Sequence, residues 1–264
     1  MVRSQSYLAV RFEGVNADAA EIEETLRRLG EAERAFTEKA YLKVDLAFAG
    51  VTVPRIRSAV ADWCRAREIT HDRLIAAVSA LWTSDLFESR LAAEIMLERK
   101  ARLLVGGDIV LIEHLLRNCG TWALVDGLAS NVAGELAERY AAQTAPVLDR
   151  WAADPDFWIR RSAMLALLRP LRRGGGDFDR FARYADAMLG EREFFIRKTI
   201  GWVLRETAKR QPELVIAWLA PRVHRASGVT VREAVKPLAA PVRDQLLRGY
   251  REKRPVLMSL SDRN

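Results

Sequence analysis

Cysteine and histidine are scarce in this 264-residue chain, which has two of the first and three of the second. Cys64 and Cys119 form no Cys-x-x-Cys pair, and His71, His114 and His224 are scattered along the chain. A structural zinc site needs four such ligands at close spacing, and a disulfide-stapled domain needs more cysteines. The sequence therefore argues against zinc, disulfides and a Cys/His nucleophile, and we expect these five residues in packing or at the surface.

Long apolar runs and strand patterns are also missing. No apolar stretch approaches the roughly 20 residues that cross a bilayer, and the N-terminus lacks the continuous apolar segment of a secretory signal. A β-type alternation is limited to a short run near residues 7–12. The glycines at 174–176 follow no strand and precede no Gly-Lys-Ser/Thr, so they are expected to form a connector rather than a phosphate-binding loop. We expect a cytoplasmic protein that does not enter membranes.

Helical periodicity, by contrast, runs through nearly the whole chain. Short breaks that carry Gly, Pro, Asp or Ser separate most of the amphipathic segments. Helices are expected at about 18–29, 31–39, 54–66, 71–81, 86–100, 108–116, 122–140, 146–151, 157–171, 178–189, 191–210, 212–219 and 231–238. This succession is typical of antiparallel helix hairpins.

An internal repeat refines that prediction. Residues 156–162 align with residues 193–199, about 37 positions later, and residues 86–90 are a weaker echo. Arg161 and Lys198 occupy equivalent places, so stacked units would align their cations on one surface. We predict an all-α, HEAT-like helical-repeat solenoid, curved with a basic concave face. Its single repeat domain would span 18–250, with an N-terminal extension at 1–17 and a frayed tail at 251–264.

The charge balance is basic, with 42 Lys and Arg against 35 Asp and Glu and a net charge of +7. Most of the cations are arginine, whose planar fork holds phosphate at two points. Nucleic acid is therefore the leading class of partner. Repeat arrays also serve as protein-binding scaffolds, and an Arg-rich composition can reflect genomic base content, so a scaffold stays an alternative.

The segment 191–210 carries two faces of different chemistry when drawn as a helix. One face is an apolar stripe and the other is a row of cations that includes a tryptophan. The apolar members are Ile196, Ile200, Val203 and Leu204, and the polar row is Lys198, Trp202, Arg205 and Lys209. Phosphates suit the cations, and a base or deoxyribose suits the indole. The alternative is that Trp202 packs sideways into a neighbouring helix and the cations are solvated.

Trp122 and Asp126 stand four residues apart, which places a ring and a carboxylate on one helix face. A carboxylate repels phosphates, so its presence on a DNA-binding surface indicates a task such as stabilising a developing positive charge. The alternative is an ordinary surface aspartate paired with Arg117 or Arg161.

Three stretches together resemble the AlkD family of DNA alkylation repair glycosylases: Trp122 with Asp126, residues 157–163 and residues 193–206. The resemblance extends from about residue 20 to 240. It implies a HEAT-like solenoid that hydrolyses the N-glycosidic bond of cationic N3- or N7-alkylated purines in duplex DNA, without flipping the base and without cleaving the strand. No metal or other cofactor is expected.

The resemblance also implies roles for individual residues. Trp122 and Trp202 match the aromatic pair that packs against the deoxyribose, Asp126 the catalytic carboxylate, and Arg161 the arginine that holds the phosphate backbone. From the cation row at 191–210, and not from the resemblance, Lys198, Arg205 and Lys209 are expected to add DNA contacts. We expect a nucleoid-associated monomer. Thr121 stands where relatives can carry a second tryptophan, which leaves the lesion range open. A non-catalytic protein that binds damaged or branched DNA, and a glycosylase for bulky natural-product adducts, are the alternatives.

Overall fold

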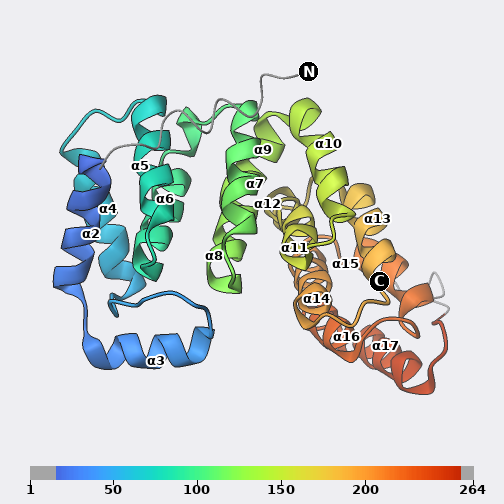
Figure 1. Ribbon diagram of the computed structural model, residues 1–264. Helices are drawn as coiled ribbons and strands as arrows, with labels where there is room; N and C mark the ends of the chain where they lie inside the picture. The colour runs from blue at the N-terminus through green and yellow to red at the C-terminus, as the bar shows by residue number, and fades with distance from the viewer. Residues whose placement is uncertain (1–15, 257–264) are drawn as a thin grey trace. The chain divides into compact units, whose positions relative to one another are not determined.

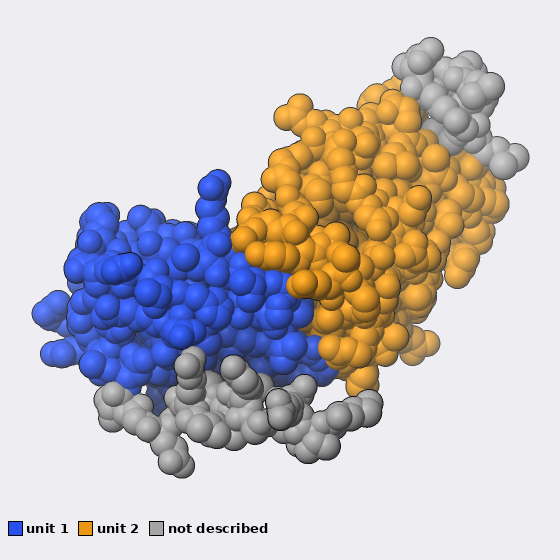
Figure 2. Space-filling view, turned by 90° about the horizontal axis from the view of Figure 1, so that it is seen from above, with its two compact units in different colours: residues 1–128 blue, residues 129–264 orange. Residues whose placement is uncertain are grey.

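The computed structural model describes residues 16–256, and every regular element in that range is a helix (Figure 1). A single isolated bridge within it, between Ala47 and Leu86, does not extend into a strand. The all-α class is therefore confirmed, whereas the strand-like run at 7–12 lies outside the described residues. The chain divides into two compact units, residues 1–128 and 129–264, which Figure 2 colours separately. None of the described helices is long and apolar enough to cross a membrane.

The first unit is built around a helix that is buried on nearly every side. Its α-helices are α2 (Ala17–Leu29), α3 (Ala32–Leu42), α4 (Val53–Arg65), α5 (His71–Thr83), α6 (Phe87–Arg99), α7 (Ile109–Arg117) and α8 (Trp122–Gly127). Helix α6 is the central one, and it contacts α2, α4, α5 and α8. Its interior residues include Ala92 and Met96, which no solvent reaches. The other helices use narrower apolar stripes to cover it.

Helix α3 differs from its neighbours because none of its residues is buried. Phe36 and Tyr41 are largely exposed on it. The segment that follows α3 is anchored by the buried carboxylate of Glu88, which accepts backbone N–H bonds from Ala49 at 3.0 Å, Gly50 at 2.6 Å and Val51 at 3.1 Å. Hydrogen bonds to Glu88 of α6, together with the burial of Leu46 and Val51, therefore fix the segment that follows α3.

The second unit is centred on α14. Its α-helices are α9 (Gly134–Arg139), α10 (Ala141–Ala152), α11 (Phe157–Leu165), α12 (Leu168–Arg172), α13 (Phe178–Met188), α14 (Phe194–Ala208), α15 (Pro212–Leu219), α16 (Gly228–Ala234) and α17 (Ala240–Glu252). Helix α14 contacts α11, α12, α15 and α16. Its predicted apolar stripe is confirmed, since all four members are fully buried.

Most helix boundaries lie near the expected ones, but the helix expected at 146–151 begins at Ala141 and the one expected at 231–238 runs Gly228–Ala234. Three other differences are larger. The expected helix at 122–140 is interrupted by a π-helical segment, Leu128–Ala133, and the one at 157–171 is broken at residues 166–167. Helix α17 was not expected, because its buried stripe of Val242, Leu246 and Gly249 is narrow within a highly charged segment. The glycines at 174–176 do connect two helices, α12 and α13. The predicted domain limits of 18–250 stay a prediction.

The sequence repeat recurs as a repeated contact. Asp156 and Glu193 each cap a helix, α11 and α14, by accepting a backbone N–H bond. In all three copies, the equivalent arginine donates to the backbone carbonyl six residues earlier. These bonds join Arg90 to Ser84 at 3.0 Å, Arg160 to Asp154 at 2.7 Å and Arg197 to Glu191 at 2.7 Å. The weak echo at 86–90 is thus a structural equivalent of the two strong copies.

Candidate functional site

Helix α8 presents the aromatic and acidic residues that the sequence singled out in the first unit. Thr121 caps the helix by accepting the N–H of Ala123 at 3.4 Å, so that Trp122 is its first residue. The Trp122 ring is exposed, and Tyr41 of α3 packs edge-on against it with 6.3 Å between the ring centroids. Asp126 lies one turn further along and is half-buried. The helix therefore offers an accessible indole and a carboxylate on one side.

A second carboxyl group lies behind α8, at Glu94 of α6. Its side chain is 5% exposed, and its Oε2 atom has no hydrogen-bond partner. Burial raises the pKa of Glu94 well above its usual range, and the nearby carboxylates Glu98 and Asp126 raise it further. Glu94 fills the space beside Gly127, where a Cβ would overlap its carboxyl group. The Glu94 side chain thus packs against the residue that follows Asp126.

The helix changes its winding directly after this point. Gly127 ends α8, and the π-helical segment Leu128–Ala133 follows it. Such wide turns are rare and are found frequently at functional sites. Asp126 therefore occupies the last turn before an unusual backbone geometry, which the sequence pattern did not indicate.

In the second unit, Arg161 and Trp202 lie together. Arg161 comes from α11 and is only 3% exposed. Its Nη1 donates to the Phe195 carbonyl at 2.7 Å and to Thr199 Oγ1, both on α14. The guanidinium carbon lies 5.7 Å from the centroid of Phe195 and 6.0 Å from that of Trp202. The cation is thus embedded among α14 side chains rather than aligned with Lys198 on an open surface, and it helps to orient the half-buried indole.

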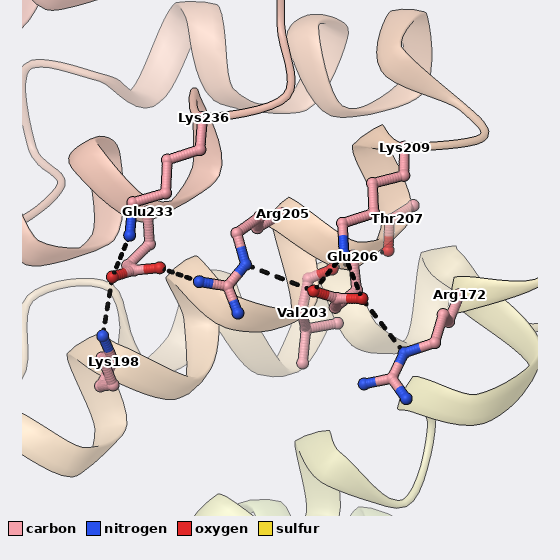
Figure 3. A network of polar contacts seen from close by, with 9 residues as sticks. All are labelled: Arg172, Lys198, Val203, Arg205, Glu206, Thr207, Lys209, Glu233 and Lys236. Atoms are coloured by element: carbon pink, nitrogen blue, oxygen red, sulfur yellow. Dashed lines mark hydrogen bonds and ion pairs between the residues drawn. The ribbon is translucent and has the colours of Figure 1, made fainter.

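The other three predicted DNA-binding residues lie on α14 or directly after it and are bound to carboxylates. Lys198 Nζ donates to Glu233 of α16 at 2.7 Å, and Lys209 Nζ donates to Glu206 at 2.8 Å. Arg205 lies between them and pairs with both acids, as Figure 3 shows. From the sequence we expected these cations either to contact phosphates or to be solvated. Their pairing with Glu206 and Glu233 was not predicted.

The two acids are strongly perturbed by this surrounding charge. Burial by itself would raise the pKa of Glu233, but hydrogen bonds from Lys198 and Lys236 outweigh it and lower the pKa to about 2. The pKa of Glu206 is lowered in the same way, because Lys209 and Arg172 outweigh its burial. Both carboxylates are therefore ionised at any physiological pH.

The structure groups the predicted residues within each unit. Trp122 and Asp126 share α8 in the first unit, and Arg161 contacts Trp202 in the second, where Lys198, Arg205 and Lys209 are linked through Glu206 and Glu233. That all seven form a single site stays a prediction. The residues that sequence reasoning missed are Glu94, Tyr41, Glu206 and Glu233. Of these four, only Glu206 and Glu233 could have been found from the sequence, because each lies among Lys and Arg residues on a predicted helix.

Fold and side chains together define an all-α repeat protein with a basic helix face and an exposed tryptophan beside a carboxylate. Comparison with known proteins identifies the family of the chain. The family of DNA alkylation repair enzymes matches residues 22–238, and the chain belongs to that family. The predicted membership is thereby confirmed. No curated protein matches the chain.

Solved structures show the same fold at low sequence identity. A predicted DNA alkylation repair enzyme from Enterococcus faecalis is 21% identical, with a TM-score of 0.71 over 80% of this chain and 97% of that one. AlkD2 from Streptococcus mutans is 14% identical, with a TM-score of 0.57 over 83% of this chain and 100% of that one. At these identities the likeness concerns the fold alone.

Proposed function

We propose that the protein is a monofunctional DNA glycosylase that hydrolyses the N-glycosidic bond of cationic N3- or N7-alkylated purines in duplex DNA without flipping the base. The observation that carries this proposal is the pairing of Trp122 and Asp126 on α8, within a chain of the DNA alkylation repair enzyme family. HEAT-like repeats would provide the scaffold. The enzyme would act on nucleoid DNA in the cytoplasm, as a monomer and without a cofactor.

The reaction requires no strong general acid from the protein. An alkylated purine already carries positive charge, so it leaves readily, and the sugar becomes oxocarbenium-like as the bond breaks. Asp126 would stabilise that cation and align the attacking water, and Trp122 and Trp202 would present electron-rich indole faces to the deoxyribose. Each cation–π contact contributes about 0.5–2 kcal/mol, and one preorganised electrostatic group about 10²–10³ in rate. An unmodified purine is a poor leaving group and would stay in place.

Glu94 adds to this account because it is buried near Asp126. The raised pKa of Glu94 favours its uncharged form, which would spare the site a second negative charge beside Asp126. Arg161 is the predicted contact to the DNA backbone; because it is 3% exposed and donates to the Phe195 carbonyl and Thr199, its side chain would have to move outward to reach a phosphate. Lys198, Arg205 and Lys209 would supply further phosphate contacts.

Base release from methylated duplex DNA tests the proposal directly. The native protein should release 7-methylguanine and 3-methyladenine over time, whereas Asp126→Asn should release neither and should bind DNA equally well or better. Asp179→Asn, which removes an exposed carboxylate from α13, is the matched control and should act like the native protein.

Other outcomes point to the alternatives. Tight, salt-sensitive DNA binding without release of either base would refute the small-lesion activity and would call for a panel of bulkier adducts. Absence of release from that panel as well would identify a non-catalytic DNA-binding protein. Negligible DNA affinity at low salt would favour a protein-binding scaffold.

A further inference from the structure

Two buried carboxylates, those of Glu206 and Glu233, link five cations of the second unit into one connected network. Glu206 of α14 accepts from Lys209 at 2.8 Å, from Arg205 at 3.3 Å, and pairs with Arg172 of α12 at 3.2 Å. Glu233 of α16 pairs with three cations as well. Its partners are Lys198 at 2.7 Å, Lys236 at 2.9 Å and Arg205. Arg205 joins the two clusters, so that five cations from α12, α14 and the turns after α14 and α16 share two acids (Figure 3).

The burial of the network is uneven. Both glutamates are 7% exposed, whereas the five cations keep between 27% and 56% of their side chains in solvent. The acids therefore lie beneath the surface and the cations lie above them. Five positive groups over two negative ones leave an excess of three positive charges on the exposed side.

The contacts leave the cations able to bind something more. An ammonium group has three donors and a guanidinium has five. Lys198 and Lys236 each use a donor on Glu233, and Lys209 donates to Glu206. Donors that remain, on side chains already held in place, suit a ligand with several acceptor oxygens and negative charge. A row of phosphates has that chemistry, and it costs less binding entropy when the cations are ordered beforehand.

We propose that Glu206 and Glu233 are positioning residues of a phosphate-binding surface formed by Arg172, Lys198, Arg205, Lys209 and Lys236, and that its partner is the backbone of duplex DNA. The proposal rests on the proposed function for the identity of the partner. It assigns DNA contacts to Arg172 and Lys236, which lie outside α14, and a role to two acids that would otherwise weaken DNA binding.

The test depends on the sign of the effect. Glu206→Gln and Glu233→Gln keep the shape of the side chain and raise the net charge by one, so simple charge attraction would tighten DNA binding. If the acids position the cations, each substitution should instead weaken the affinity for undamaged duplex DNA roughly 10-fold, because freed side chains must be ordered on binding. The slope of log affinity against log salt should become shallower by about one for each phosphate that the protein no longer neutralises.

Glu213→Gln is the matched control, because Glu213 is exposed on α15 of the same unit and its substitution makes the same change of charge. It should bind DNA as tightly as the native protein or more tightly. Equal or tighter binding by both Glu206→Gln and Glu233→Gln, relative to this control, would overturn the positioning role.

Thermal unfolding and far-UV circular dichroism show whether each variant is folded. If the acid variants unfold, Arg172→Gln and Lys236→Gln decide the proposal, since each should lower the affinity and make the salt slope shallower by about one while the α14 cations stay paired. Unchanged slopes in both would overturn it. Native protein that binds DNA but excises nothing would refute the enzymatic proposal and leave this surface intact, whereas native protein without salt-sensitive DNA binding would overturn both.

Discussion

The contact between Gly127 and Glu94 makes the substitution Gly127→Ala informative, because it adds one methyl group directly behind the candidate catalytic carboxylate. A Cβ at this position would overlap the Oε1 and Cδ atoms of Glu94 and would lie 3.1 Å from Oε2. The Glu94 carboxyl must then move by about 2 Å to reach an ordinary van der Waals distance. Because Glu94 is buried, that movement has to be absorbed by the packing of α6 against α8.

The magnitude follows from two opposing effects. In a helix without this neighbour, Gly→Ala would stabilise by about 0.5–1 kcal/mol. Overpacking of a filled site costs about 1–3 kcal/mol, so the net effect should be a loss of up to about 2.5 kcal/mol. For a chain of this size each kcal/mol lost corresponds to a decrease in Tm of about 2–4 °C. Because the displaced α8 carries Asp126, the rate of base excision should fall as well.

A double-mutant cycle measures the contact. Thermal unfolding of Gly127→Ala, Glu94→Ala and the double variant should show that the added methyl destabilises the native protein but is neutral or stabilising when Glu94 is truncated. Two results would refute the reasoning: a higher Tm for Gly127→Ala alone, or the same loss of stability in both backgrounds.

Two further predictions concern buried acids. The unfolded chain ionises Glu94 at its ordinary pKa of 4.5, whereas the folded chain keeps the proton to higher pH. Native stability should therefore fall above that pH by about 1.4 kcal/mol per pH unit relative to Glu94→Gln, until the folded acid ionises, as urea unfolding at pH 5 and pH 7 can measure. A constant difference between the two pH values would contradict a protonated Glu94. Glu88→Ala removes the acceptor of the N–H groups at residues 49–51 and should cost about 3–5 kcal/mol in the free energy of unfolding, with Glu88→Gln costing less. Equal stability of both Glu88 variants and the native chain would show that solvent replaces these bonds.

Several parts of the fold could be predicted from local patterns alone. The apolar stripe of α14 depends on spacing within a few residues, and all four of its members are buried. The repeat was visible because equivalent residues keep the same contact, such as that of Arg160 with a carbonyl six residues earlier. Helix α17 escaped prediction because its buried stripe is too narrow to stand out from its charges.

The candidate site divides in the same way. The sequence by itself determined that Trp122 and Asp126 share a helix face, because four residues make about one turn. Only the tertiary structure decided that Arg161 is buried, that Glu94 packs against Gly127, and that Glu233 pairs with α14.

The physical reason is the range of the interactions involved. Periodicity reports which side of a helix is apolar, but the partner of a charged side chain depends on which helices pack together. Lys198 and Glu233 are 35 residues apart and meet only because α16 packs on α14. Ionisation is equally non-local, since the raised pKa of Glu94 comes from burial by neighbouring helices and the lowered pKa of Glu233 comes from Lys198, Lys236 and Arg205 around it.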